Sequence, residues 1–165
     1  MDFKSENQKK TKYMIFNFSK KYQFSTRLLL NDKNIEEIDS TKLLGTFITK
    51  DLKWDLNTSN IVKKATMRLQ LLIKVASFGA SIEDLKTVYI TFVRSILEQS
   101  AVVWHSSLTE ENKQDLERIQ RSAVLIMMGQ KFKSYSKSLL FLDLEDLNSR
   151  RENLCLTFAL RTMKN

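Results

Sequence analysis

The chain contains no proline and only three glycines among its 165 residues, namely Gly45, Gly79 and Gly129. Proline breaks a helix because it lacks an N–H and its ring clashes with the preceding turn, and glycine weakens a helix through backbone entropy. A chain with so few of both residues can form helices that are rarely interrupted. We therefore expect a mainly helical protein.

The first third of the chain differs from the rest, because its apolar runs are short and rich in aromatic or β-branched residues. The runs occupy residues 13–16, 27–30 and 43–48, and the polar residues 31–34 separate the second run from Ile35 and Ile38. Such runs, bounded by polar residues, indicate strands and turns. We expect a small antiparallel β segment over residues 1–54, in which residues 43–48 form one strand.

After Trp54 the apolar residues recur every three or four positions, which is the helical period. A first helix is expected from Thr58 to Phe78 with Gly79 as its C-terminal cap, and a second after a capping box at Ser81 and Asp84. Thr109 begins a third helix that runs to Gly129.

A fourth helix would carry Leu147, Leu154 and Phe158 inward, with Arg150, Arg151 and Arg161 at the surface. The expected inward positions of the first three helices are Ile61, Ala65, Leu69, Leu72 and Ala76; Leu85, Tyr89, Phe92, Ile96 and Trp104; and Leu116, Ile119, Ala123, Ile126 and Met127. The expected fold is therefore α+β and mainly α, with a four-helix bundle over residues 55–165.

The charge balance favours an anionic partner. Lysine and arginine number 27 against 19 acids, a net charge of +8, and a basic protein attracts polyanions such as nucleic acid. One cysteine and one histidine cannot build a disulfide framework or a zinc site. No apolar run approaches the roughly 18 residues of a membrane span, and the first residues do not resemble a signal peptide. We expect a cytoplasmic or nuclear location and no membrane partner.

Catalytic groups are not evident. The adjacent acids Glu36 and Glu37, like the pairs at 83–84 and 110–111, fall at expected turns or helix starts, where capping explains them. His105 has no identifiable nucleophile or orienting acid, and Cys155 reads as a buried thiol within a helix. No glycine-rich phosphate loop is present. We predict no catalytic residue, no metal site, no cofactor and no small-molecule substrate.

Two long intervals lack acids. The first, between Asp55 and Glu83, contains Lys63, Lys64, Arg68 and Lys74 away from the apolar stripe of the expected helix. The second, residues 118–142, contains Arg118, Arg121, Lys131, Lys133 and Lys137, with Phe132 and Tyr135 among them. Such intervals suit phosphate contacts and base stacking, and the alternative is a solvated basic face.

Several short segments, in order, resemble the end of the reverse-transcriptase domain of non-LTR (LINE-like) retrotransposons. They are KKTKYMIFN at 9–17, KLLGT at 42–46, LKW at 52–54, VY at 88–89, FVRSILE at 92–98, VW at 103–104, LERIQ at 116–120 and RR at 150–151. The resemblance covers nearly the whole chain. It implies the end of the palm, the primer grip and a thumb that holds the template–primer duplex.

By this resemblance the nucleic-acid-binding candidates also include Lys9, Lys10 and Lys12 of the palm end, with Leu44 and Gly45 of the primer grip. Lys10 or Lys9 would lie near the phosphates of the incoming nucleotide, and the alternative is a solvated lysine before a strand. The helix from Thr58 to Phe78 would belong to the thumb.

Enzymes of this family hold two magnesium ions on aspartates upstream of the matched segments, and this chain contains no Asp–Asp pair. It also has Gln8 where the family often has proline, and no cysteine–histidine tail. We therefore expect a polymerase fragment that is inactive alone and binds an RNA/DNA template–primer duplex together with a missing upstream polymerase region, where magnesium would be held. The alternative is a domesticated helical module that binds a protein.

Overall fold

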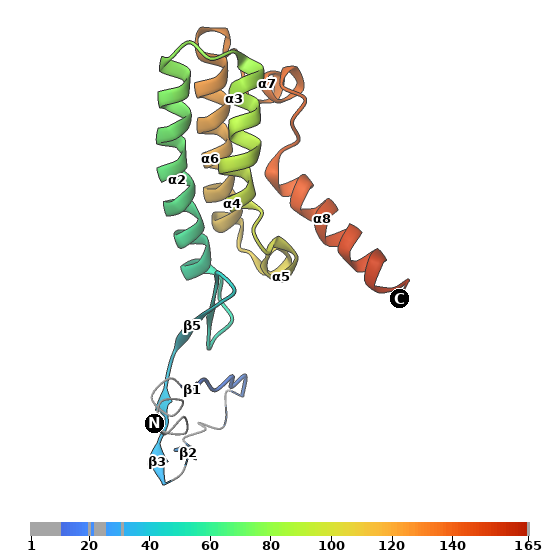
Figure 1. Ribbon diagram of the computed structural model, residues 1–165. Coiled ribbons are helices and arrows are strands. Elements are labelled where there is room, and N and C mark those ends of the chain that lie inside the picture. Colours follow the sequence, from blue (N-terminus) through green and yellow to red (C-terminus); the bar gives the residue numbers. More distant parts are fainter. Residues whose placement is uncertain (1–10, 20, 22–25, 31, 165) are drawn as a thin grey trace. The chain divides into compact units, whose positions relative to one another are not determined.

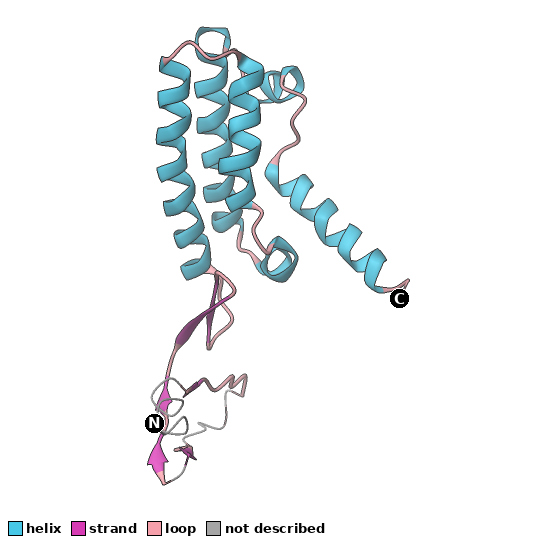
Figure 2. Ribbon diagram, viewed as in Figure 1, coloured by secondary structure: helices cyan, strands magenta, loops and turns pink. Residues whose placement is uncertain are grey.

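The computed structural model describes residues 11–19, 21, 26–30 and 32–164. The chain divides into two compact units, Met1–Leu56 and Asn57–Asn165. Strands lie in the first unit, and helices make up the second (Figures 1 and 2). The mainly helical α+β class expected from the sequence is confirmed. No described helix is both long enough and apolar enough to cross a lipid bilayer.

The first unit contains three short strand pairs. Strand β1 (Lys12–Tyr13) pairs in parallel with β4 (Glu36–Glu37), whereas β2 (Leu29–Leu30) pairs antiparallel with β3 (Lys33–Asn34). The Tyr13 hydroxyl donates a hydrogen bond to the Thr26 carbonyl at 2.8 Å. The expectation of antiparallel pairing is thus wrong for β1, and of residues 13–16 only Tyr13 lies in a strand, together with its neighbour Lys12.

Residues 43–48 do not form one strand, which corrects the sequence expectation. They belong to a hairpin of β5 (Ser40–Leu43) and β6 (Thr46–Thr49), joined by Leu44 and Gly45. Both turn residues have positive φ angles, 46° and 91°, as a two-residue type I′ turn requires. Asparagine or glycine usually occupies the first position of such a turn. Because leucine stands there in this chain, the sequence pattern did not indicate a turn.

The second unit begins with α2 (Asp55–Ser77), whose buried side includes the expected Ile61, Ala65, Leu69 and Leu72. Gly79 follows with a φ angle of 78° and donates its N–H to the Ala76 carbonyl, which confirms the C-terminal cap. Helix α3 (Ile82–Val88) starts with the expected capping box, in which the Ser81 and Asp84 side chains bond each other's backbone N–H groups.

The second expected helix has several segments rather than one regular helix. They are α3, the π-helical turn η1 (Tyr89–Arg94), α4 (Ser95–Leu97), α5 (Ala101–Trp104) and the 3-10 turn η2 (His105–Ser107). Between α4 and α5, Ser100 has a φ angle of 56° and interrupts the helix.

The π-helical turn changes which residues face the core. Its wider turn advances the helical phase, so Val93 and Leu97 are fully buried after Leu85 and Tyr89. The expected inward residue Phe92 is instead 47% exposed, and Ile96 is only half-buried. That expectation was wrong because it assumed a uniform period of 3.6 residues.

Helix α6 (Glu110–Met128) is capped by Thr109, whose hydroxyl accepts from the Asn112 N–H at 3.2 Å. Four of its five expected inward residues are buried, and Ile126 is half-buried. After η3 (Gly129–Lys131), the short helix α7 (Tyr135–Phe141) buries Ser138 and Leu139. No helix was predicted for this segment. Helices α3 and α7 both contact α6.

In helix α8 (Leu147–Thr162), several side chains do not lie where the sequence predicted. Arg151 is fully buried rather than at the surface, and Phe158 is 54% exposed rather than inward. Helix α8 contacts α5, α6 and η2, and its C-terminal end leans away from the other helices (Figure 1). Hydrophobicity predicted an inward Phe158, but the surface against which α8 packs ends before that residue.

We predict that Leu44→Asn stabilises the β5–β6 hairpin, because asparagine tolerates the left-handed conformation that costs another L-residue about 1 kcal/mol. Amide hydrogen exchange of residues 40–49 should slow. The control is Leu43→Asn, which places asparagine at an exposed strand position and should speed exchange. Faster exchange in Leu44→Asn would contradict the assignment of turn strain.

Candidate nucleic-acid interface

The candidate residues of the first unit lie on its surface where the structure describes them. Lys12 is exposed and pairs with Glu36 at 2.9 Å, which neutralises its charge locally. Leu44 is 90% exposed at the hairpin turn beside Gly45. Lys9 and Lys10 lie outside the described residues.

The basic residues of α2 occupy two neighbouring sides of the helix. Lys63 and Lys74 are about three turns apart and share one side, whereas Lys64 and Arg68 are about one turn apart on the next. Lys64 is half-buried and the other three are exposed. Within the described part of the chain, none of the four forms an ion pair. Their charge is thus broader than the single face expected from sequence.

The two arginines of α6 lie among acids, although the sequence interval after them has none. Arg118 pairs with Asp115 at 3.0 Å. The Arg121 guanidinium lies 4.9 Å from the centre of the Tyr135 ring. Both arginines line a pocket of about 390 Å³ with Gln114 and Glu117, so this surface has mixed charge.

The clearest convergence of basic residues joins the end of α6, the following segment and α7. Three exposed lysines, Lys131, Lys133 and Lys137, line one pocket of about 270 Å³. The remaining lining residues are Met128, Ser138 and Phe141, and no acid is among them. None of the three lysines forms an ion pair with a described residue. We call this feature the lysine pocket.

The aromatic residue at the lysine pocket is not one that the sequence indicated. The Tyr135 hydroxyl takes part in a polar network, and the Tyr135 ring lies against the Arg121 guanidinium. Phe132 is half-buried. Phe141 lines the pocket and is 64% exposed. The available signal was its spacing of four residues from Lys137, which places both on one side of a helix.

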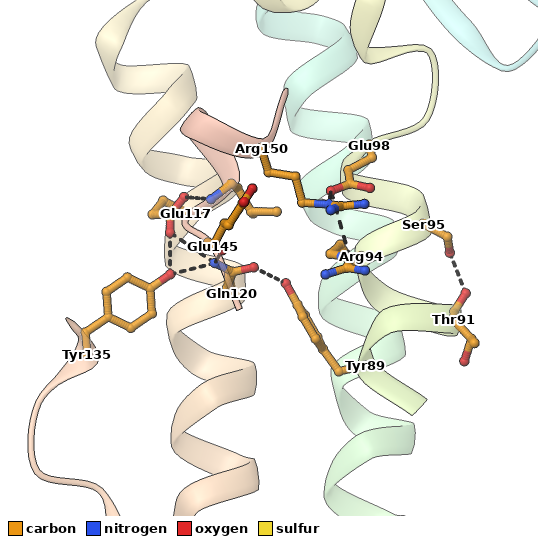
Figure 3. A network of polar contacts seen from close by, with 11 residues as sticks. Tyr89, Thr91, Arg94, Ser95, Glu98, Glu117, Gln120, Tyr135, Glu145 and Arg150 are labelled. Carbon is orange, nitrogen blue, oxygen red and sulfur yellow. Dashed lines mark hydrogen bonds and ion pairs between the residues drawn. The ribbon is translucent and has the colours of Figure 1, made fainter. Parts of the chain in front are cut away.

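The helix that carries Lys137 and Phe141 is held by a buried polar network around Gln120 (Figure 3). The Tyr89 hydroxyl donates to the Gln120 side-chain oxygen. The Gln120 amide donates to the Tyr135 hydroxyl and to the Glu145 carbonyl, both at 2.9 Å. Gln120 is fully buried, so these bonds satisfy a side chain that water does not reach.

Glu117 extends the network to the start of α8. Its carboxylate accepts from the Tyr135 hydroxyl, and from the Leu147 N–H at 2.9 Å. Burial raises the pKa of Tyr89, and burial followed by the bond to Glu117 raises the pKa of Tyr135. Both tyrosines therefore remain protonated donors at neutral pH. The network joins η1, α6, α7 and α8 as a scaffold, and the sequence reading missed it.

A separate ionic cluster ties α8 to η1 and to Glu98, the residue that follows α4. Arg150 donates through Nε to the Glu98 carboxylate, and Arg94 Nε lies 3.9 Å from the same carboxylate oxygen (Figure 3). Glu98 is only slightly exposed, so the attraction is screened less than at an open surface. Arg150 was expected at the surface and is half-buried in this contact.

Arg151 and His105 form a buried pair beside Trp104. Arg151 donates through Nε to His105 Nδ1 at 3.3 Å, and its guanidinium lies 5.9 Å from the Trp104 ring. The two terminal guanidinium nitrogens have no hydrogen-bond partner within the described residues. Burial, and next the charge of Arg151, lower the pKa of His105, so its ring is the neutral acceptor that this bond needs.

Cys155, expected to be a buried thiol, is half-buried in α8. Burial raises the pKa of the Cys155 thiol, which disfavours the nucleophilic thiolate. Among the residues that the structure describes, no three His, Cys, Asp or Glu side chains gather closely enough to hold a metal ion. The described surface offers charge and shape for binding.

We predict that Tyr135→Phe lowers the free energy of unfolding by about 1–3 kcal/mol, because it leaves buried polar groups of Glu117 and Gln120 unsatisfied. Urea denaturation measures this loss. Tyr13→Phe is the matched control, since its hydroxyl bonds are exposed and should matter little. Equal losses in the two variants would contradict a special role for the Gln120 network.

We predict a loss of stability in mild acid that depends on His105. The folded-state pKa is lowered, so the unfolded chain takes up the proton first, at its ordinary value of 6.5. Stability should therefore be full above this pH, fall as the pH drops through it, and level off below the folded-state pKa. Urea titrations between about pH 7.5 and about pH 5.5 test this. His105→Gln, which keeps an acceptor but does not titrate, should flatten the profile.

Comparison of the chain with protein-family models, curated proteins and solved structures gives no match.

Proposed function

We propose that this chain binds the sugar-phosphate backbone of an RNA/DNA template–primer duplex, as the palm-end, primer-grip and thumb part of a non-LTR retrotransposon reverse transcriptase. The observation that carries the proposal is the lysine pocket, where Lys131, Lys133 and Lys137 converge without a neutralising acid among the lining residues. Phosphates attract such unpaired cations, and binding releases condensed counterions.

The positive charge of α2 supports the same proposal. Lys63, Arg68 and Lys74 are exposed on a helix that contains no acid after Asp55. Lysine and arginine contacts with phosphates position a duplex but do not read its sequence. The proposed binding is therefore strong at low salt and independent of base sequence.

The resemblance of the sequence to these polymerases supplies the identity of the partner. In the proposal the magnesium-binding aspartates belong to an upstream polymerase region, and this chain contributes binding without chemistry of its own. A cytoplasmic or nuclear location, where RNA and DNA are accessible, accompanies the proposal.

A second candidate function is binding of a protein partner by α8. Leu156, Phe158, Leu160 and Met163 are all at least half exposed, at 62%, 54%, 60% and 83%. Apolar side chains gathered at one helix end often mark a protein-binding surface. Such binding would depend little on salt, which separates this candidate from the first.

We predict that the affinity for an RNA/DNA hybrid duplex falls linearly on a plot of log affinity against log salt, and the slope for B-form DNA is about 0.9 per phosphate neutralised. Replacing Lys131, Lys133 and Lys137 with glutamine should reduce the slope by about 2 to 3. Fluorescence anisotropy over a salt series measures both values.

The control replaces Lys50, Lys53 and Lys113 with glutamine. Each of these lysines has an acidic partner, namely Asp39, Asp51 and Glu110 respectively. The control changes the net charge equally but should leave the slope nearly intact. A flat salt dependence in the unmodified chain would refute backbone binding, and equal effects of both triple variants would refute the lysine pocket as its centre.

A further inference from the structure

The lysine pocket has a feature that backbone binding does not use, because much of its lining is apolar. Met128 is almost fully buried at its wall, and Phe141 presents a ring that is 64% exposed. Lysine stems add methylene groups to such a wall while the ammonium groups reach toward water. The pocket therefore combines an apolar interior with positive charge around it.

The volume of the pocket limits its occupant. The recess has a volume of about 270 Å³. This lies just below the usual range for drug-sized ligands, which begins at about 300 Å³. A recess of this volume can admit one planar ring system.

We propose that the lysine pocket accepts a single unpaired base, stacked on Phe141, while Lys131, Lys133 and Lys137 hold the phosphates on either side of it. This inference rests on the proposed nucleic-acid function and assigns that site a class of ligand. A base within a continuous duplex has both faces covered by its neighbours, so it cannot enter. An unpaired nucleotide at a strand end or bulge has a free face and flanking phosphates.

The side chains have separate tasks in this arrangement. Stacking on an aromatic ring tolerates every base, because each base has a π face, so the pocket recognises the unpaired state and not the sequence. The lysines supply most of the salt dependence, and Phe141 supplies the preference for an unpaired base. The two contributions can therefore be removed independently.

The polar network determines where this pocket forms. Tyr135 begins α7 and is bonded to Glu117 and Gln120 on α6, and Lys137 and Phe141 lie on the same short helix. A fixed α7 keeps the phenyl ring beside the end of α6, so the recess is already formed before a base enters. Binding then costs little ordering of the protein.

The test compares three hybrid duplexes with the full chain by fluorescence anisotropy: one blunt, one with a single unpaired nucleotide at a strand end, and one whose extra nucleotide lacks its base. The unpaired nucleotide should bind about five- to 150-fold more tightly than the blunt duplex, the range that one stacked base provides. The abasic duplex, which keeps the added phosphate, should lose this gain.

Phe141→Ala should abolish the preference and leave the salt slope unchanged. The matched control is Phe78→Ala, because Phe78 is an 87% exposed phenylalanine outside the pocket, and this variant should retain the preference. Circular dichroism verifies that both variants remain folded, as expected for exposed positions.

Equal affinity for the three duplexes, with a steep salt slope, would overturn the base pocket and leave backbone binding intact. Absence of any salt-dependent binding would instead overturn the proposed function itself. Vesicles of phosphatidylserine provide a further arm: binding to them that Phe141→Ala abolishes, without a preference among the duplexes, would replace the base with an anionic membrane as the occupant.

Discussion

The side chain of Gln120 is the interaction on which the arrangement of the helical unit most depends. This side chain is fully buried in α6. Its amide group forms hydrogen bonds with Tyr89 on η1, with Tyr135 on α7 and with the carbonyl of Glu145 before α8. An unmade hydrogen bond at such a site costs far more than a made one contributes, so the partners must approach from defined directions. The network therefore specifies how four segments meet, which apolar packing alone would leave less determined.

Function in this scaffold follows from where charge remains unpaired. Whether the charge of a basic residue is paired depends on which acids lie near it in the folded chain. Lys12 pairs with Glu36 and Arg118 with Asp115, whereas the lysines of the lysine pocket have no such partner among the described residues. The proposals of backbone binding and of an unpaired-base site both rest on this difference. Neither proposal requires a nucleophile, a metal ion or a general base supplied by this chain.

Much of the fold was predictable because it is locally encoded. The Ser81 capping box, the Thr109 cap and the glycine after α2 are short-range signals whose physics acts within one helical turn. The basic positions were also visible as types and intervals. The sequence could not show the π-helical turn that brings Val93 inward in place of Phe92, or the role of Phe141 at the pocket, because both depend on how distant segments pack.

By itself, the sequence determined that this chain is basic, mainly helical and poor in helix-breaking residues, since composition and periodicity act through local backbone preferences. Only the tertiary structure decided that Arg151 is buried against His105, that Phe158 is exposed, and that three lysines converge on one recess. These outcomes depend on which helix surfaces pack against another element. The apolar period of one helix does not show where the surface that it packs against ends.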